Sequence, residues 1–197
     1  VQAIPSTPPL SMPALSNTSI AILATNGFEQ SELVQPKQSL EDAGATVHVI
    51  SPESGSIKGW DEKDWGASVE VDVSLADADP ADYAALVLPG GQMNPDILRM
   101  NGDAVAFVKA FAEAGKPIAA ICHAPWLIVE AGLADGRTAT SWPSLRTDLT
   151  NAGADVVDRS VAVDTDGPFT LITSRKPEDI PDFVGAIVDA LSEPVAA

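Results

Sequence analysis

The stretch KPIAAICHAPWLIVEAG, residues 116 to 132, decides the fold. An apolar run ends just before Cys122 and predicts a buried strand, and the remainder, from about His123 onward, predicts a helix. Ala120 and Ala124 stand two residues before and two residues after Cys122. Small residues at these places let a sharp strand-to-helix turn close without collisions. The stretch therefore predicts a nucleophile elbow, with the thiol standing clear of a sheet.

Predicted strands and helices alternate on both sides of this elbow. The predicted strands are SIAILA from Ser19 to near Thr25, TVHVIS (46–51), ALVLPGG (85–91), VAVD (161–164) and FTLIT (169–173). The predicted helices are 30–43 with a kink at Pro36, a helix that ends at Gly115, and a terminal helix whose apolar face runs from Ile180 to Leu191. Residues 52–73 fit an irregular hairpin and a plain loop equally well.

This alternation predicts a three-layer α/β/α sandwich with a mostly parallel central sheet, because parallel crossovers place helices over both faces. In such sheets, reactive groups collect outside the carboxyl ends of the strands. Here those ends are Gly27 to Glu32, Gly90 to Asp96 and Cys122 to Ala124.

The length of 197 residues predicts one domain, which we place at residues 19–193. Residues 1–18 are rich in proline and serine and carry no charge, so we expect a tail, and we expect a second short tail at 194–197.

The charge balance argues against some classes of partner. Lys and Arg total 11 against 28 Asp and Glu, a net charge of −17, which repels nucleic-acid phosphates and anionic lipid headgroups. The longest apolar stretch, Pro117 to Val129, is too short for a membrane helix. One cysteine allows no disulfide within the chain, and no basic signal region is visible at the start, so we expect a reducing, cytoplasmic location.

Cys122 is the candidate nucleophile. A helix N-terminus favours the thiolate, so we expect the pKa of this thiol to be lowered, whereas the alternative is a buried structural cysteine. His123 can take a proton at neutral pH, but neighbouring side chains point differently, so it would need an acid from elsewhere to orient it or would simply cap the helix. The other histidine, His48, lies in a strand and is interpreted as structural.

Two further strand ends can assist the thiol. Gly90 and Gly91 can expose backbone N–H groups, which together with the His123 N–H would form an oxyanion hole. Glu32 follows the first strand and could share a hydrogen bond with the Cys122 sulfur, although a solvated acid at a helix start explains both Glu32 and Glu29 equally well.

The chain resembles the DJ-1/PfpI superfamily, and its PfpI branch in particular. The resemblance is carried by four stretches that occur in this order along the chain: NGFEQSEL, ALVLPGG, KPIAAICHAP and TATSWPS. The resemblance implies a flavodoxin-like sandwich with Cys122 as nucleophile and Glu32 as the buried acid at its sulfur. It also implies His123 as base, with the Gly91 and His123 amides as oxyanion donors. In similar proteins a third acid comes from a neighbouring subunit, and the matching residue here is Asp96.

Two positions depart from the family pattern. Ala124 stands where the family commonly has glycine, which narrows the floor of the site slightly. Trp142 stands where the DJ-1 branch carries a histidine, which favours the PfpI branch and leaves His123 as the base.

The resemblance implies a stress-related cysteine hydrolase, either an intracellular peptidase or a glyoxalase or deglycase, acting as a homodimer or larger oligomer on a small carbonyl or peptide substrate. No metal or organic cofactor is implied, since two histidines and one cysteine give no ligand spacing. The alternative is a non-catalytic oxidative-stress sensor or holdase in which Cys122 is oxidised.

Overall fold

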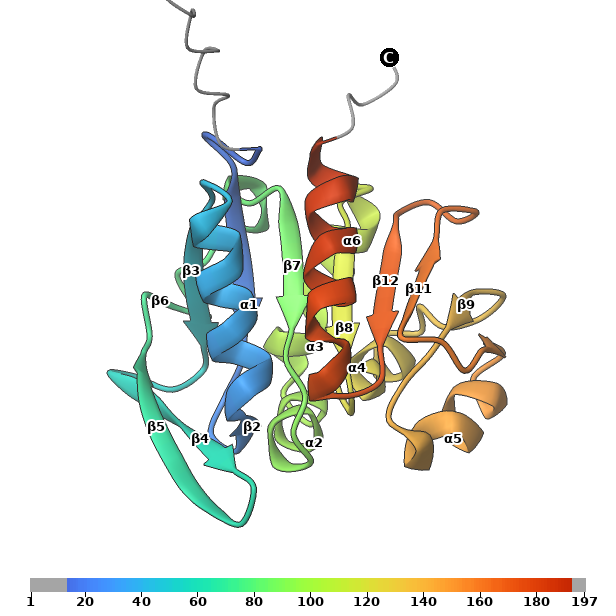
Figure 1. Ribbon diagram of the computed structural model, residues 1–197, viewed down its shortest axis with the longest axis horizontal. Coiled ribbons are helices and arrows are strands. Elements are labelled where there is room, and N and C mark those ends of the chain that lie inside the picture. The colour runs from blue at the N-terminus through green and yellow to red at the C-terminus, as the bar shows by residue number, and fades with distance from the viewer. Residues whose placement is uncertain (1–13, 193–197) are drawn as a thin grey trace, which may run out of the picture.

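The computed structural model describes residues 14 to 192 (Figure 1). Its strands are β1 Ser19–Leu23, β2 Phe28–Glu29, β3 Thr46–Ser51, β4 Ser56–Asp61, β5 Asp64–Glu70, β6 Val73–Ser74, β7 Ala85–Leu88, β8 Ile118–Ile121, β9 Thr138–Ala139, β10 Asp155–Val156, β11 Val161–Asp164 and β12 Leu171–Ser174. Its helices are α1 Gln30–Asp42, α2 Met93–Arg99, α3 Gly102–Glu113, α4 Pro125–Glu130, α5 Arg146–Asn151 and α6 Ile180–Ser192. Short 3₁₀ turns lie at Pro80–Asp82, Pro143–Leu145 and Pro177–Asp179.

The seven-stranded central sheet has the order β11-β12-β8-β7-β1-β3-β6. Neighbouring strands are parallel except for β11, which runs antiparallel to β12 at the edge. The carboxyl ends of β1, β7 and β8 therefore lie together at one end of the sheet, the lower end in Figure 1. The expected mostly parallel sheet is confirmed.

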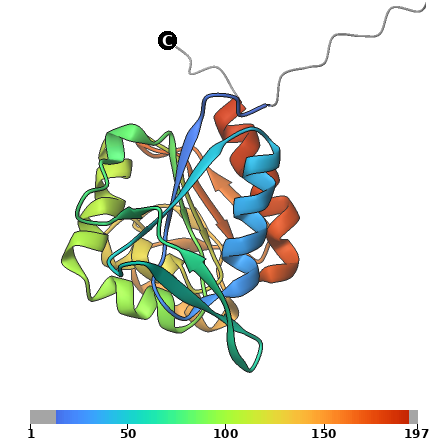
Figure 2. The same cartoon turned by 90° about the vertical axis from the view of Figure 1, so that its left-hand side faces the viewer.

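Helices cover both faces of this sheet, so the three-layer sandwich is confirmed as well (Figure 2). One hydrophobic cluster joins the sheet to α1 and α6 and includes Leu33 and Phe183. The other joins the opposite face to α3 and α4 and includes Phe111 and Leu127. Because strand side chains alternate between faces, successive residues of β8 enter the two clusters in turn.

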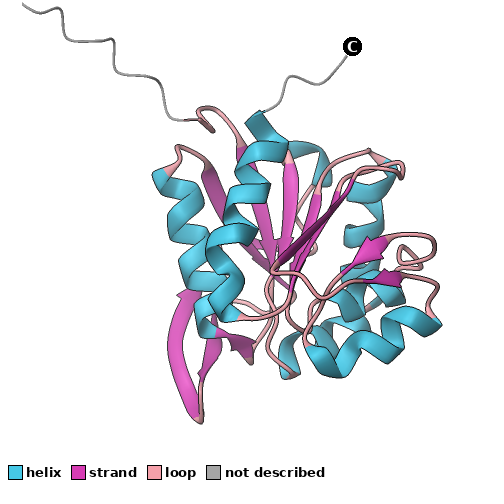
Figure 3. Cartoon of the chain, turned by 45° about the vertical axis from the view of Figure 1, so that its right-hand side comes forward, coloured by secondary structure: helices cyan, strands magenta, loops and turns pink. Residues whose placement is uncertain are grey.

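Residues 52–73 contain a hairpin, one of the two interpretations left open by the sequence. Strands β4 and β5 pair antiparallel, and β2 adds to β4 in parallel to give a three-stranded sheet separate from the central one. Figure 3 shows this hairpin extending past the central sheet, beside the carboxyl ends of its strands. A second small sheet pairs β9 with β10.

The start of the described chain differs from the expected tail at residues 1–18. The Leu15 side chain is only 1% exposed and belongs to the cluster under α1 and α6. Its N–H donates to the Ala43 carbonyl, and the Thr46 N–H donates to the Thr18 carbonyl. Residues from Leu15 therefore pack with the domain, because one buried leucine outweighs the local proline-rich composition. Residues 1–13 and 193–197 lie outside the described part of the chain.

The structure describes no helix that is long and apolar enough to cross a membrane.

Candidate active site

Cys122 lies at a sharp turn directly after β8. Its backbone φ of 65° is in the left-handed region, which residues other than glycine rarely adopt. The Cys122 N–H donates to the Ser174 carbonyl at 2.9 Å, and its own carbonyl accepts from the Trp142 N–H at 2.9 Å. These two hydrogen bonds, to Ser174 and Trp142, hold the strained backbone of Cys122 in place, and strained backbone of this kind is common at functional sites. The predicted elbow is present, although α4 begins only at Pro125.

His123 lies next to the thiol in space as well as in sequence. The Cys122 Sγ and His123 Nδ1 atoms are 3.1 Å apart, because the left-handed turn brings together two side chains that an extended strand would separate. The His123 ring stacks on Trp142, with ring centres 5.8 Å apart, and it is 9% exposed. Burial lowers the pKa of His123, so the imidazole is neutral at neutral pH and can accept a proton.

Glu32 comes from the first turn of α1 and is fully buried beside Cys122. The Gly90 N–H donates to its Oε2 at 2.9 Å, whereas its Oε1 is buried without a hydrogen-bond partner among the described residues. Burial, the largest cause, raises the pKa of Glu32 to about 8. This carboxyl group therefore keeps its proton at neutral pH.

The expected lowering of the pKa of Cys122 differs from what the structure indicates. The residue is only 5% exposed, and burial raises the pKa of its thiol, with a negative charge on Glu32 acting in the same direction. The N–H groups of Gly91 and His123 act in the opposite direction. Because α4 is only six residues long and begins three residues later, its dipole does not outweigh burial. A protonated Glu32 carries no negative charge, which removes one of the causes that raise the pKa of this thiol.

The glycine pair after β7 is needed at this place. A Cβ at Gly90 would lie 2.5 Å from Glu32 Oε2 and 2.7 Å from the Cys122 Cβ. Gly91 has a φ of +82°, and its N–H acts on the Cys122 sulfur together with that of His123. These two amides, which sequence reasoning assigned to an oxyanion hole, are therefore brought together at the thiol.

Asn94 positions these glycines and was not found from the sequence. It is fully buried on α2, and its Nδ2 donates to the carbonyls of Pro89 at 2.8 Å and Gly90 at 3.1 Å. Its Oδ1 accepts from the Thr25 N–H at 2.8 Å, which ties the end of β1 to the same turn. A short polar residue after a Pro-Gly-Gly turn was the available signal.

These groups open into a cleft of about 480 Å³, which we call the Cys122 cleft. Its lining is Glu29, Glu32, Trp60, Glu62, Gly91, Gln92, Cys122, His123, Trp142, Lys176, Pro177 and Glu178. A slightly larger groove, of about 550 Å³, lies between β11 and α6, but its lining contains neither Cys nor His. The chemistry therefore belongs to the Cys122 cleft.

Asp96 does not line this cleft. It is exposed on α2, while the structure places Cys122, His123, Glu32 and Gly91 together. Two exposed apolar side chains follow it, Ile97 on the same helix at 42% exposure and Met100, directly after the helix, at 76%. Within one chain, then, His123 has no acid from this segment.

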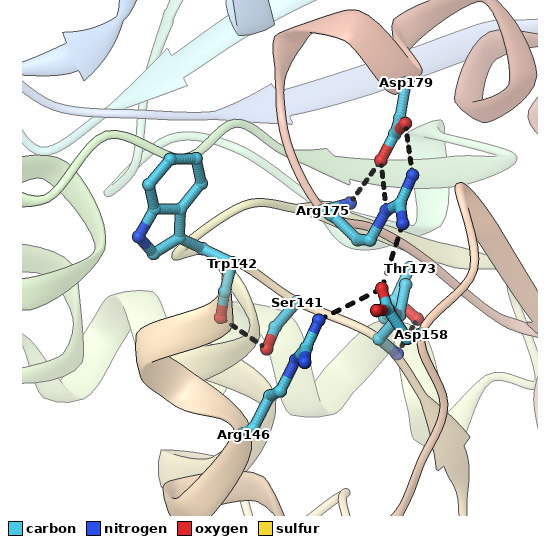
Figure 4. A network of polar contacts seen from close by, with 8 residues as sticks. Ser141, Trp142, Arg146, Asp158, Thr173, Arg175 and Asp179 are labelled. Carbon is cyan, nitrogen blue, oxygen red and sulfur yellow. Dashed lines mark hydrogen bonds and ion pairs between the residues drawn. The ribbon is translucent and has the colours of Figure 1, made fainter.

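The wall opposite the hairpin is held by an arginine network (Figure 4). The Arg175 guanidinium donates to the Asp179 carboxylate through Nε at 2.8 Å and Nη2 at 3.0 Å. Its Nη1 reaches Asp158 at 2.9 Å, and Arg146 binds the same carboxylate at 3.0 Å. These contacts fix the connection from β12 to α6, which carries Lys176 and Glu178 into the cleft.

No group of three or more His, Cys, Asp or Glu side chains that could hold a metal ion occurs within residues 14–192.

Comparison with known proteins identifies relatives of the whole domain. A model of the DJ-1/PfpI family matches residues 18–190. General stress protein 18 of Bacillus subtilis is 46% identical over 165 residues, covering 83% of this chain and 92% of that protein. Protein/nucleic acid deglycase 2 of Escherichia coli is 41% identical over 165 residues, covering 83% and 92%. Deglycase TK1284 of Thermococcus kodakarensis is 40% identical over 161 residues, covering 82% and 92%.

Solved structures share the fold. A two-domain protein from Anabaena variabilis, with a DJ-1/ThiJ/PfpI-like and a ferritin-like domain, has a TM-score of 0.80 and 33% identity, covering 91% of this chain and 52% of that chain. Drosophila melanogaster DJ-1beta has a TM-score of 0.78 and 29% identity, covering 89% and 90%.

Proposed function

The chain belongs to the DJ-1/PfpI family, and from that premise we propose that it is a cysteine hydrolase of the deglycase type. Its substrates would be adducts of small dicarbonyl compounds, such as methylglyoxal, with amino or thiol groups. Relatives named as deglycases support this type of role. The observation that carries the proposal is a cysteine with a strained backbone in a cleft, whose sulfur lies 3.1 Å from an imidazole nitrogen and beside a buried carboxyl group.

Each group has a role in this reaction. The Cys122 thiol gives its proton to His123 Nδ1, and the thiolate sulfur forms a bond to the carbonyl carbon of the adduct. The π electrons of that carbonyl move to its oxygen, which the N–H groups of Gly91 and His123 stabilise. Glu32 remains protonated, and its unpartnered Oε1 carries the proton that can be donated to sulfur or substrate oxygen.

The overall reaction balances without an external oxidant. One water is consumed, the bond between the adduct carbon and the amine or thiol breaks, and the amine or thiol leaves with a proton. Within the three-carbon fragment the former aldehyde carbon is oxidised to a carboxylate while the ketone is reduced to an alcohol, so the fragment leaves as lactate. The bond between the Cys122 sulfur and the fragment breaks when lactate is released, and His123 returns the proton to that sulfur after moving the protons of the earlier steps.

A second copy of the chain would complete the site. His123 has no acid from its own chain's segment after the Pro-Gly-Gly turn, and Asp96 is exposed beside the apolar side chains of Ile97 and Met100. We propose that this surface of α2 packs on a second copy and brings Asp96 to the partner's imidazole, where it orients the ring and stabilises its protonated form.

Subunit mixing tests that arrangement. Inactive Cys122→Ser chains mixed with inactive Asp96→Asn chains should recover part of the activity, because each mixed dimer contains one intact site. Absence of recovery, with subunit exchange demonstrated by native mass spectrometry, would exclude Asp96 as the acid acting between subunits.

Turnover of methylglyoxal adducts and of a peptide substrate tests the main proposal. Cys122→Ser and His123→Asn should each lower kcat/KM for the adducts by about 100-fold or more. His48→Asn is the matched control, because His48 contacts Tyr83 away from the cleft, and it should retain activity. Adduct turnover that survives Cys122→Ser would refute the proposal. Peptide cleavage alone would indicate a peptidase, and sulfur oxidation without turnover would indicate a redox sensor.

A further inference from the structure

The outer part of the Cys122 cleft is made by the β4–β5 hairpin and β2, and it is acidic. Glu29 of β2 and Trp60 of β4 are paired in register and both line the cleft, so their side chains share one face of the small sheet. Glu62, at the hairpin turn, lines the same cleft. The pKa of Glu29 is raised by burial first, with the charges of Asp61 and Glu62 adding to this effect. These acids are therefore close enough to repel one another, which an incoming cation would relieve.

The Trp60 ring is not available as a hydrogen-bond donor to a ligand. Its Nε1, the only donor of an indole, is used at 3.1 Å on the Glu62 carbonyl. Trp65 packs edge-on against it, with ring centres 5.6 Å apart at 80°. What Trp60 offers to the cleft is aromatic surface, which attracts cations and not anions.

Glu62 has an unusual backbone for its type. Its φ of 52° lies in the left-handed region, where glycine or asparagine is less strained. The two-residue turn between Asp61 and Asp64 requires such a φ, so the turn accounts for it and fixes Glu62 at the rim of the cleft. The fully buried Oε1 of Glu32, which has no hydrogen-bond partner among the described residues, lies beside Cys122 in the wall of the same cleft and is available there to a polar group of the substrate.

The opposite wall does not reverse this charge. Lys176 is the one lysine or arginine that lines the cleft among the described residues, and it enters from the β12–α6 connection together with Glu178. Carboxylates therefore outnumber it, and the chain as a whole carries a net charge of −17. A field of this sign concentrates cations and repels anionic substrates.

We propose that the surface formed by Glu29, Trp60 and Glu62 is a subsite for a cationic group, an ammonium or a guanidinium, carried by the substrate beside its reacting carbon. This inference rests on the proposed function, because it assigns the reacting carbon to Cys122 in the same cleft. It identifies the substrate class as adducts of basic compounds, in preference to adducts of anionic thiols or acids.

Substrates that share a reacting carbon and differ in charge test the subsite. The hemithioacetals of methylglyoxal with thiocholine, 2-mercaptoethanol and 3-mercaptopropionate carry a cation, no charge and an anion beside the same sulfur. The ratio of kcat/KM for the cationic over the anionic substrate should be about 10 or more at low salt, and it should fall in 0.5 M NaCl because exposed charges are screened.

Variants of the hairpin locate the effect. Glu62→Gln should reduce this ratio about threefold, and Glu62→Lys should bring it to about one or below. Glu70→Gln removes a carboxylate from the same hairpin, outside the cleft, and should leave the ratio as in the wild type. Equal kcat/KM for all three substrates, or equal ratios in Glu62→Lys and Glu70→Gln, would overturn the subsite while leaving the deglycase function standing.

A binding measurement keeps the subsite testable without turnover. Choline and its neutral isostere 3,3-dimethylbutan-1-ol are titrated while the indole N–H resonance of Trp60, assigned with Trp60→Phe, is followed by NMR. Choline should shift this resonance at concentrations where the isostere does not, and Glu62→Lys should abolish the shift. If no hemithioacetal is turned over but choline binds in this way, the proposed function fails and the subsite stands. If choline and the isostere act alike, the subsite is refuted.

Discussion

Replacing Glu32 by glutamine should change how stability depends on pH. The ordinary pKa of this carboxyl group is 4.5, and burial raises it to about 8 in the folded protein. Between these two values the unfolded chain has lost the Glu32 proton and the folded chain retains it. The folded state thus binds more protons, so the free energy of unfolding falls as pH rises from about 4.5 to about 8. Glutamine is neutral at every pH and removes this term.

The size of the effect follows from the two pKa values. For each pH unit between the two pKa values, the free energy of unfolding of the wild type falls by about 1.4 kcal/mol relative to that of Glu32→Gln. Between pH 5 and pH 7.5, the free energy of unfolding of the variant should therefore rise by about 3 kcal/mol relative to that of the wild type. The comparison is one of slopes, so a fixed change in packing or hydrogen bonding caused by the amide cancels.

Urea unfolding of both proteins across pH 5 to 8 measures this difference. A Cys122→Ala background prevents the thiol from exchanging the proton with Glu32. Glu113→Gln, which removes an exposed carboxyl group from α3, is the control, and its curve should run parallel to that of the wild type. Parallel curves for Glu32→Gln and the wild type would show that Glu32 is ionised in the folded protein, and the proton assigned to its Oε1 would then be absent.

Three other substitutions have expected outcomes. Cys122→Ala should abolish adduct turnover in a kinetic assay while changing the unfolding free energy by no more than about 1 kcal/mol, and a larger loss would identify a core residue. Gly90→Ala should cost several-fold more activity than Gly102→Ala, measured with the same substrate, because its Cβ would meet Glu32 and Cys122 whereas a Cβ at Gly102 meets nothing. Leu15→Ala should destabilise the domain by about 2 to 4 kcal/mol in thermal or urea unfolding. An unchanged unfolding midpoint would show that Leu15 does not pack on the domain and belongs to the tail.

The central architecture was predictable because its signals are local. Apolar runs identify β1, β7 and β8 as buried parallel strands. The glycines that follow these runs identify the end of the sheet where the carboxyl ends of the strands lie together. The sequence predicted that Cys122, His123, Glu32 and Gly91 lie together, because they come after the carboxyl ends of these strands and because they match the family pattern.

Other features depend on contacts between distant segments. Asn94 bonds to Thr25, 69 residues away, and Trp60 enters the cleft only because β4 pairs with β2. The burial of Leu15 requires α1 and α6 to be in place, and the pKa of the Cys122 thiol depends on how completely its neighbours exclude water. No pattern of residue types along the chain contains this information.

The bond from the Cys122 N–H to the Ser174 carbonyl also sets an order of events during protein synthesis. Ser174 is made 52 residues after Cys122, a delay of roughly 3 to 10 seconds at about 5 to 20 residues per second. Until then, the bond that anchors the elbow to β12 does not exist, β12 does not pair with β8, and α6 does not cover this face of the sheet. A nascent chain therefore holds its only cysteine in an unfinished turn, and the reactive geometry arises only when nearly the whole domain has left the ribosome.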